Sequence, residues 1–306
     1  MKRLLALLLA LTLMLSLVAC GTAPETETEE EVSTETQSEN KNDKNDKNNK
    51  NDKKKVTFTE LVAVDNEECL IKITGITEDE IWGYTLKAQL ENKSADKTYM
   101  FSLQNASING VQCTSLFAEE VAAGKKANGK IYFSDEALEE NDIGNYTDIE
   151  LTFRVYDSDD WSADDVALET VHVYPYGEDE ATKFVRKAKA TDNVILDNEY
   201  VTAIVTGYEE DEIWGYTVNL FLLNKTDKEV MFSTDNDSVN GYMIDPYFSA
   251  TVSPGKCSFE SISWSDDEFE ENDITTVEEI EFDLVVRDYN NWTSDGLAKE
   301  TITLNP

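Results

Sequence analysis

The residues best suited to metal chemistry lie in two aspartate-rich stretches, DSDDWSADD at 157–165 and DYNNWTSD at 288–295. Calcium accepts such alternating Asp and Asn oxygens as ligands. Both stretches lack the glycine and the closing glutamate of an EF-hand loop, so a solvated loop is the competing interpretation. The candidate calcium ligands are Asp157, Asp159, Asp160, Asp164, Asp288 and Asp295.

Each stretch also contains a tryptophan, Trp161 or Trp292. Exposed aromatic rings on loops can serve as platforms for sugars, which makes glycan binding one hypothesis. A half-buried tryptophan that caps one end of the fold is the alternative. Both residues are therefore candidate binding residues.

Catalytic chemistry has little support in the residue types. The chain holds a single histidine, His172, which excludes a multi-histidine metal site and limits any histidine base to that residue. No phosphate-binding loop, dinucleotide glycine motif, paired CxxC or zincin signature is present. A hydrolase with an Asp/Glu pair needs one carboxyl with a raised pKa in a cleft. We predict a non-enzymatic protein and keep such a hydrolase as the alternative.

Residues 1–20 have the pattern of an export signal. Lys2 and Arg3 precede an apolar run, which ends in the residues LVAC at 17–20. The pattern resembles the signal of bacterial lipoproteins, and the resemblance implies that Cys20 is lipidated and becomes the first residue of the mature chain. Two acyl chains, at about 0.8 kcal/mol per buried CH2, give a stable anchor. The protein is therefore expected on the outer face of the cytoplasmic membrane, at the cell surface.

The charge balance limits the partners. Lys and Arg number 26 and Asp and Glu number 63, for a net charge of −37. Binding of DNA or RNA requires clustered basic residues that neutralise phosphates, so we predict no nucleic-acid partner. The expected contact with the membrane is the lipid on Cys20.

Residues 21–55 show no apolar periodicity. The segment is first rich in Thr and Glu and then in Lys, Asn and Asp. Such a composition buries too little surface to offset the entropy of ordering, so a disordered linker is expected. As a flexible coil it spans about 30–35 Å on average and about 115–125 Å when stretched.

The octet EDEIWGYT occurs at 78–85 and again at 210–217. Further landmarks follow in the same order, among them Asn-Gly at 109–110 and 240–241 and EENDI at 139–143 and 270–274. A duplicated domain explains this order. We predict domains at 56–175 and 193–306, joined by a linker at 176–192.

Each repeat has the pattern of an all-β domain. Short segments rich in Val, Ile, Thr, Tyr and Phe alternate with Gly, Asn, Asp and Ser. In the first repeat the predicted strands are 69–76, 82–91, 98–108, 111–118, 127–134, 147–156 and 168–174. The predicted fold class is all-β, with two tandem seven-stranded antiparallel β-sandwich domains of immunoglobulin-like architecture.

Alternation along the second strand predicts which side chains face the core. The set Trp82, Tyr84, Leu86, Ala88 and Leu90 shares one face, and Trp214 opens the corresponding set in the second repeat. On the opposite face, the second repeat has Phe221 and Leu223 where the first has polar residues. These two form a candidate patch that the first domain, the linker or a partner must cover.

Three cysteines follow Cys20, namely Cys69, Cys113 and Cys257. An exported protein can hold disulfides, and Cys69–Cys113 is the pairing available within one repeat. Reduced, buried thiols are the preferred interpretation.

The recurring landmarks, including NK, MFS, NG, GK and EEND, resemble those of uncharacterised immunoglobulin-like domains. Such domains occur in envelope lipoproteins of low-GC Gram-positive bacteria, often duplicated behind a polar tether. The resemblance implies fold and location and no catalytic residue. We therefore expect a lipid-anchored module that binds a protein or an envelope polymer, or that acts as a spacer, and we expect no cofactor besides the possible calcium.

Overall fold

The computed structural model describes residues 55–306 except 80–82, 134–137, 139–140, 142, 212 and 292–295. The first repeat contains β1 (Leu61–Asp65), β2 (Cys69–Asp79), β3 (Gly83–Asn92), β4 (Tyr99–Ile108), β5 (Val111–Gln112), β6 (Ser115–Leu116), β7 (Ala118–Val121), β8 (Lys126–Phe133), β9 (Ile149–Asp157) and β10 (Ala167–Val173). The second contains β11 (Asn193–Asp197), β12 (Val201–Asp211), β13 (Gly215–Asn224), β14 (Val230–Val239), β15 (Tyr242–Met243), β16 (Ser249–Val252), β17 (Cys257–Trp264), β18 (Ile280–Asp288) and β19 (Ala298–Leu304). A 3-10 helix, η1 (Glu178–Glu180), and a helix, α3 (Asp266–Glu271), accompany them.

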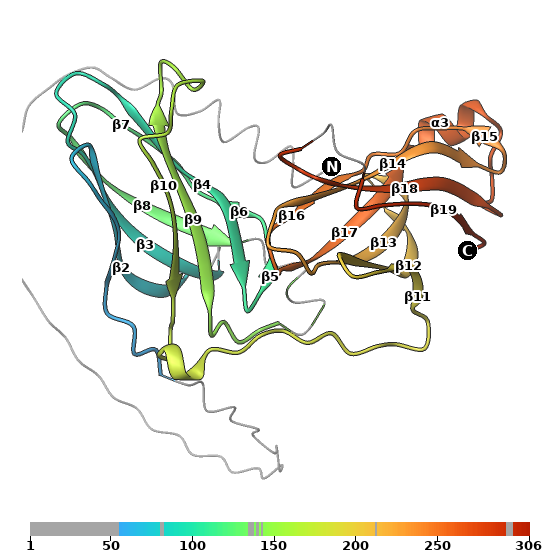
Figure 1. Cartoon of the computed structure of the whole chain (residues 1–306), viewed down its shortest axis with the longest axis horizontal. Coiled ribbons are helices and arrows are strands. Elements are labelled where there is room, and N and C mark those ends of the chain that lie inside the picture. The colour runs from blue at the N-terminus through green and yellow to red at the C-terminus, as the bar shows by residue number, and fades with distance from the viewer. Residues whose placement is uncertain are drawn as a thin grey trace, which may run out of the picture. The chain divides into compact units, whose positions relative to one another are not determined.

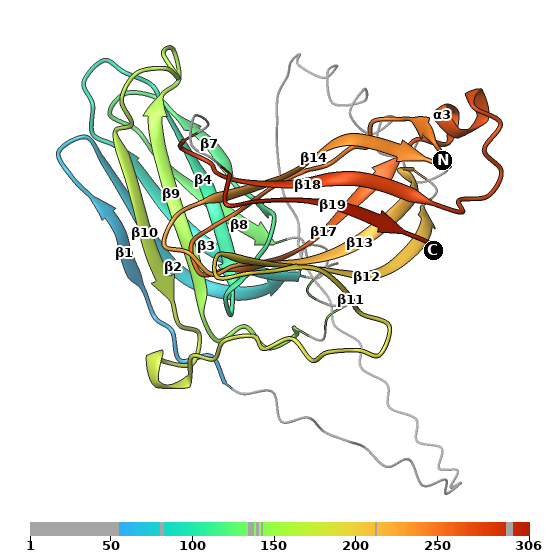
Figure 2. The same cartoon turned by 45° about the vertical axis from the view of Figure 1, so that its right-hand side comes forward.

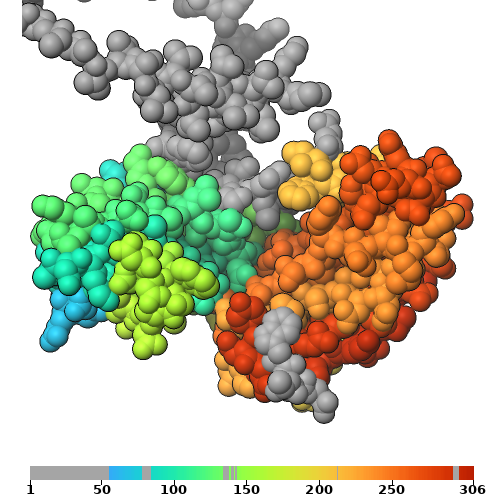
Figure 3. Space-filling view, turned by 90° about the horizontal axis from the view of Figure 1, so that it is seen from above, coloured from blue at the N-terminus to red at the C-terminus, as the bar shows by residue number. Residues whose placement is uncertain are grey.

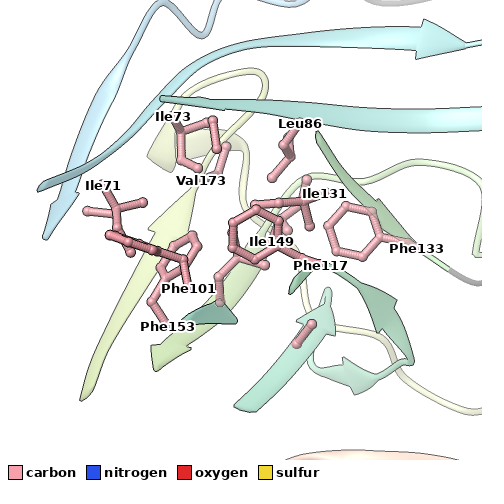
Figure 4. Close-up of a cluster of buried hydrophobic side chains, with 14 of the residues drawn as sticks. Ile71, Ile73, Leu86, Phe101, Phe117, Ile131, Phe133, Ile149, Phe153 and Val173 are labelled. Carbon is pink, nitrogen blue, oxygen red and sulfur yellow. The ribbon is translucent and has the colours of Figure 1, made fainter. Parts of the chain in front are cut away.

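The first repeat consists of two facing sheets (Figures 1 and 2). One has the order β1-β2-β3-β8-β6, and the other runs β10-β9-β4-β5 with β7 paired to β4. Alternate side chains of both sheets meet between them. Phe101, Ile131 and Phe153 are fully buried there (Figure 4).

The second repeat has the same pairing scheme. Its sheets run β11-β12-β13-β17 and β15-β14-β18-β19, with β16 paired to β14. A register shift between Ile73 and Gly75 in β2 recurs between Val205 and Gly207 in β12. The core of the second repeat includes the fully buried Trp264.

The predicted all-β fold class with sandwiched antiparallel sheets is confirmed. The predicted strand 111–118 divides into β5, β6 and β7. Strand β1 has no counterpart among the predicted strands, because a register shift between Val62 and Val64 interrupts the alternation of its side chains. Within the described residues, no helix has the length and apolar character needed to cross a membrane.

The prediction of a buried Trp214 is wrong, because its side chain is 57% exposed. Asp211 Oδ1 accepts hydrogen bonds from the backbone N–H groups of Ile213 at 2.7 Å and Trp214 at 2.8 Å. The carboxylate thereby closes a turn of the Asx type, which overrides the strand alternation. Trp82, predicted to occupy the same position in the first repeat, lies outside the described residues.

Gly215 lets the chain pass from this turn into β13. Its φ is 74°, and a Cβ atom there would lie 2.2 Å from the carbonyl oxygen of Trp264. Glycine meets both conditions, because it tolerates positive φ and has no Cβ. The predicted alternation holds further along the strand, where Val218, Leu220 and Leu222 are buried.

A fully buried asparagine closes the loops of each sandwich. Asn224 Nδ2 donates to the carbonyl oxygens of Lys228 at 2.7 Å, Val252 at 2.9 Å and Ser253 at 3.0 Å. Its Oδ1 accepts from the backbone N–H of Thr226 at 2.9 Å. The amide therefore joins the loop after β13 to the loop between β16 and β17.

Asn92 makes the corresponding contacts in the first repeat. Its Nδ2 donates to the carbonyl oxygens of Lys97 at 2.8 Å and Val121 at 2.7 Å, and its Oδ1 accepts from Ser94 N–H at 2.9 Å. Both amides are 0% exposed. Buried polar groups of this kind are stable only with their partners in place.

The two repeats share one sheet through a short parallel pairing of β5 and β17, at Val111 and Cys257. Gln112 extends the contact, since its Nε2 donates to Thr251 O at 2.6 Å and its Oε1 accepts from Ser253 N–H at 2.9 Å. The side-chain amide of Gln112 thus bonds to backbone of the second repeat much as a strand neighbour would.

We predict that Asn224→Ala lowers the free energy of unfolding by about 2–3 kcal/mol, because several buried backbone groups lose their partner. Denaturation followed by circular dichroism measures the change. Asn219→Ala is the matched control, because Asn219 lies on the same strand and its Nδ2 donates to the exposed Glu209. Equal losses in the two variants would contradict the clamp role of Asn224.

Candidate functional site

The candidate calcium ligands Asp157 and Asp288 both pair with a lysine. Lys97 Nζ lies 3.1 Å from Asp157 Oδ2, and Lys228 Nζ lies 2.9 Å from Asp288 Oδ2. The hydrogen bond from the lysine lowers the pKa of each aspartate. Asp157 therefore pairs with the loop before β4, and Asp288 pairs with the loop before β14.

The remaining candidate ligands do not converge. Asp159, Asp160 and Asp164 are exposed, and Asp160 Oδ1 accepts from the hydroxyl of Ser162 at 2.7 Å. Among the described residues, no three acidic, histidine or cysteine side chains form a group that could hold a metal ion. Asp295 lies outside the described residues.

Trp161 extends into solvent with 73% of its surface exposed. Its backbone carbonyl accepts a long hydrogen bond from Arg154, at 3.5 Å, and Arg154 also pairs with Asp165 at 2.7 Å. The loop that carries Trp161 is thus attached to the sheet while the ring remains free. Trp292, the counterpart in the second repeat, lies outside the described residues.

The candidate patch at Phe221 and Leu223 belongs to a block of four apolar positions. In the second repeat, Phe221 pairs with Phe259 and Leu223 with Cys257. At the equivalent register positions of the first repeat, Gln89 pairs with Asn128 and Glu91 with Lys126. The two repeats therefore present opposite chemistry on the same sheet face.

Intramolecular contacts cover this apolar block. Phe221 is only 6% exposed and packs in the core cluster of the first repeat. Two residues of the linker complete the cover, because Phe184 lies 5.9 Å from Phe259 between ring centroids and the Arg186 guanidinium lies 5.3 Å from the Phe221 ring. The first domain and the linker, two of the three covers that the sequence suggested for Phe221 and Leu223, therefore both contact this apolar block.

The linker also borders two hollows, of about 450 and 380 Å³. Arg186 lines both, and its guanidinium makes two hydrogen bonds of 2.6 Å to the carboxylate of Asp192. The hydrogen bond from Arg186 lowers the pKa of Asp192 to about 2. This cation is therefore neutralised within the linker.

Glu260 is the carboxylate that lines the smaller hollow. Burial raises the pKa of Glu260, although the hydroxyl of Ser258 donates a hydrogen bond to its Oε1. A glycosidase-type hydrolase requires a second carboxylate beside the first. The described lining residues supply none, so the hydrolase alternative gains no support from this hollow.

The single histidine, His172, lies between two carboxylates. Its Nδ1 is 2.7 Å from Asp148 Oδ1 and its Nε2 is 3.2 Å from Glu150 Oε2. Lys256 also contacts Glu150 Oε2, at 2.6 Å, and joins this group to the second repeat. The imidazole ring also stacks on Tyr174, with ring centroids 5.6 Å apart.

Among the described residues, Cys69, Cys113 and Cys257 form no disulfide. Cys69 and Cys257 are buried, and burial raises their pKa values to about 11 and about 12. Thiols with such values are poor nucleophiles at neutral pH. Cys113 is half-buried.

One further buried acid occurs in the second repeat. Asp237 is 4% exposed, and its Oδ1 has no hydrogen-bond partner. Burial raises the pKa of Asp237. The first repeat has the buried Ala106 at the corresponding position of β4.

An exposed aromatic pair, missed by the sequence analysis, lies at the end of the second repeat. Trp214 and Tyr247 are 57% and 61% exposed, with ring centroids 6.5 Å apart and planes at 68°. Tyr247 is placed by an isolated bridge to Ser263, a long-range pairing that the local sequence does not encode. The turn signal of Asp211 followed by Gly215 could have indicated the exposure of Trp214.

No protein-family model matches the chain, and no curated protein matches it. Among solved structures, the YadV chaperone matches over 72% of this chain and 92% of its own, with 11% identity and a TM-score of 0.22. A Salmonella enterica SafA pilin in complex with the SafB chaperone matches over 80% and 100%, with 9% identity and a TM-score of 0.22. A red sea bream transglutaminase matches over 82% of this chain and 31% of its own, with 8% identity and a TM-score of 0.21. Likenesses at these TM-scores carry no argument about function.

We predict that Asp237→Ala raises the melting temperature at neutral pH by an amount on the order of a few degrees. The pKa of Asp237 is higher in the folded state than in the unfolded chain, so ionisation destabilises the fold as pH rises above the unfolded value. Thermal melts of both proteins across pH 4–8 should therefore diverge as pH increases. A difference that does not depend on pH would contradict a buried carboxylate as the cause.

Replacing Phe221 and Leu223 by the residues of the first repeat should disrupt the contact between the repeats. Phe221→Gln with Leu223→Glu removes buried apolar surface, and we expect a loss of about 2–4 kcal/mol in unfolding free energy. Calorimetry measures the change. Gln89→Ala with Glu91→Ala in the first repeat is the control and should have little effect. A similar loss in both variants would contradict the assignment of the apolar block as the contact.

Proposed function

We propose that this protein is a non-catalytic binding module displayed at a membrane surface. The lipid on Cys20 anchors it, and residues 21–55 act as a polar tether that separates the folded repeats from the bilayer. This arrangement would place the sandwiches on the outer face of the cytoplasmic membrane. The partner would then be a protein or polymer of the cell envelope.

The observation that carries the binding role is a pair of exposed aromatic rings on loops that the fold holds in place. Trp214 and Tyr247 are both more than half exposed, and their backbones are fixed by hydrogen bonds to other parts of the second repeat. Loops positioned by a rigid scaffold are where binding residues concentrate. Aromatic side chains are also the residues most enriched at recognition surfaces.

The recurring polar residues support a scaffold rather than a reaction centre. Asn92 and Asn224 hold loops, and Asp157 and Asp288 hold lysines. Asn109 and Asn240 occupy hairpin turns at positive φ, the conformation that such two-residue turns require. These duplicated polar residues thus account for structure. The exposed aromatic pair is specific to the second repeat because Leu116 occupies the position of Tyr247 in the first.

We predict that Cys20→Ser abolishes membrane anchoring, because the serine has no thiol for the acyl-bearing group. Labelling with a palmitate analogue in a bacterial host that processes lipoproteins measures the modification, and fractionation measures location. Cys69→Ser is the matched control and should keep both label and location. Labelling of the Cys20→Ser variant, or membrane retention without label, would overturn the anchoring proposal.

A further inference from the structure

The end of the second repeat that carries the aromatic pair is distant from the contact between the repeats. Strand β17 pairs with β5 at Cys257 and ends at Trp264, about 23 Å further on at the usual rise per residue. The β12–β13 turn and α3 share this far end (Figures 1 and 2). In the space-filling view, the yellow-orange segment around the β12–β13 turn lies beside the orange-red segment that includes α3 (Figure 3).

The backbone beneath the two rings is held firmly. Asp211 fixes the backbone at Trp214 with two hydrogen bonds, and Tyr247 exchanges two backbone hydrogen bonds with Ser263, of 2.7 and 3.3 Å. Under them, the hydroxyls of Thr217 and Ser263 are 3.0 Å apart and buried. None of these hydrogen bonds involves either aromatic ring. The backbone that carries the exposed rings is therefore ordered without them.

The charged residues in the segments that form this surface are all acidic. Sequence segments 190–224, 229–255 and 257–286 contain no lysine or arginine, and they supply the β12–β13 turn, Tyr247 and α3. Asp266 Oδ1 would lie 3.0 Å from a Cβ at Gly215, the residue after Trp214. The carboxylates of Asp211 and Asp266 therefore lie beside the backbone of Trp214 and Gly215.

We propose that the aromatic pair Trp214 and Tyr247, together with the acidic residues of the same segments, binds a basic segment of a partner protein. The faces of aromatic rings carry negative electrostatic potential and attract the side chains of Lys and Arg. The acidic residues of these segments and the net charge of −37 attract the same groups at longer range. This inference rests on the proposed binding function and names the chemistry of its partner.

Charge favours this partner over a neutral glycan. Sugar binding uses aromatic faces together with hydrogen-bonding groups, and a neutral sugar gains nothing from the negative charge of these segments. The first repeat differs at the position of Tyr247, where Leu116 is 56% exposed. The docking surface is therefore assigned to the second repeat.

The test measures binding of a fluorescein-labelled octa-arginine peptide to the chain without residues 1–20, by anisotropy at physiological salt. We expect Trp214→Ala with Tyr247→Ala to weaken binding about tenfold. Trp161→Ala removes another exposed tryptophan and should leave affinity within about twofold. Asp266→Asn should weaken binding by a smaller factor and should reduce its dependence on salt.

Equal affinity of the aromatic double variant and the unaltered protein would overturn the proposal, since nonspecific attraction to the acidic chain would explain the binding. Binding of chitohexaose that depends on Trp214, without an effect of Trp214 on the peptide, would overturn it in favour of a glycan platform. Melting curves check that each variant is folded, and Asp266→Asn provides a second test if the aromatic variant is not. The anchoring proposal fails separately, through labelling of Cys20.

Discussion

A side-chain amide without access to water sets the loop geometry of each sandwich. Where strands end, backbone carbonyls turn away from the ladder and would be buried without donors. Asn92 and Asn224 supply those donors from the last position of β3 and β13. Because the amide reaches across to the segment that leads into the neighbouring strand, it supports the register of β3 with β8 and of β13 with β17. The β13–β17 register pairs Phe221 with Phe259 and Leu223 with Cys257, and these side chains form the contact between the repeats.

Much of the fold could be predicted from the sequence, because strand periodicity and turn residues are local signals. The prediction succeeds where side chains alternate, as from Val218 to Leu222, and at Asn-Gly turns that require positive φ. It fails at Trp214 because a single carboxylate, that of Asp211, bonds to the backbone and stops the strand early. It fails at β1 because a bulge shifts the side-chain alternation.

The candidate site was harder to predict from the sequence, because it depends on contacts between distant parts of the chain. Comparison of the repeats identified Phe221 and Leu223 as needing cover, since two matching strands should bury matching faces. The exposure of Tyr247 depends on a bridge to Ser263, a contact that no local pattern contains. The pairing of Asp157 with Lys97 likewise depends on the neighbouring strands, so an acidic loop that resembles a cation site in sequence uses one of its carboxylates for internal support.

The unequal faces of the two repeats also limit self-assembly. The first repeat keeps a Lys126–Glu91 ion pair of 2.8 Å at the positions where the second is apolar. Head-to-tail association that does not close produces filaments, and it requires one adhesive face and one complementary face left free. Here the apolar face of the second repeat is covered within its own chain, and the corresponding positions of the first repeat are polar or charged. The apolar face of the second repeat is thus satisfied within one chain, and the first repeat offers no matching apolar pair at these strand positions.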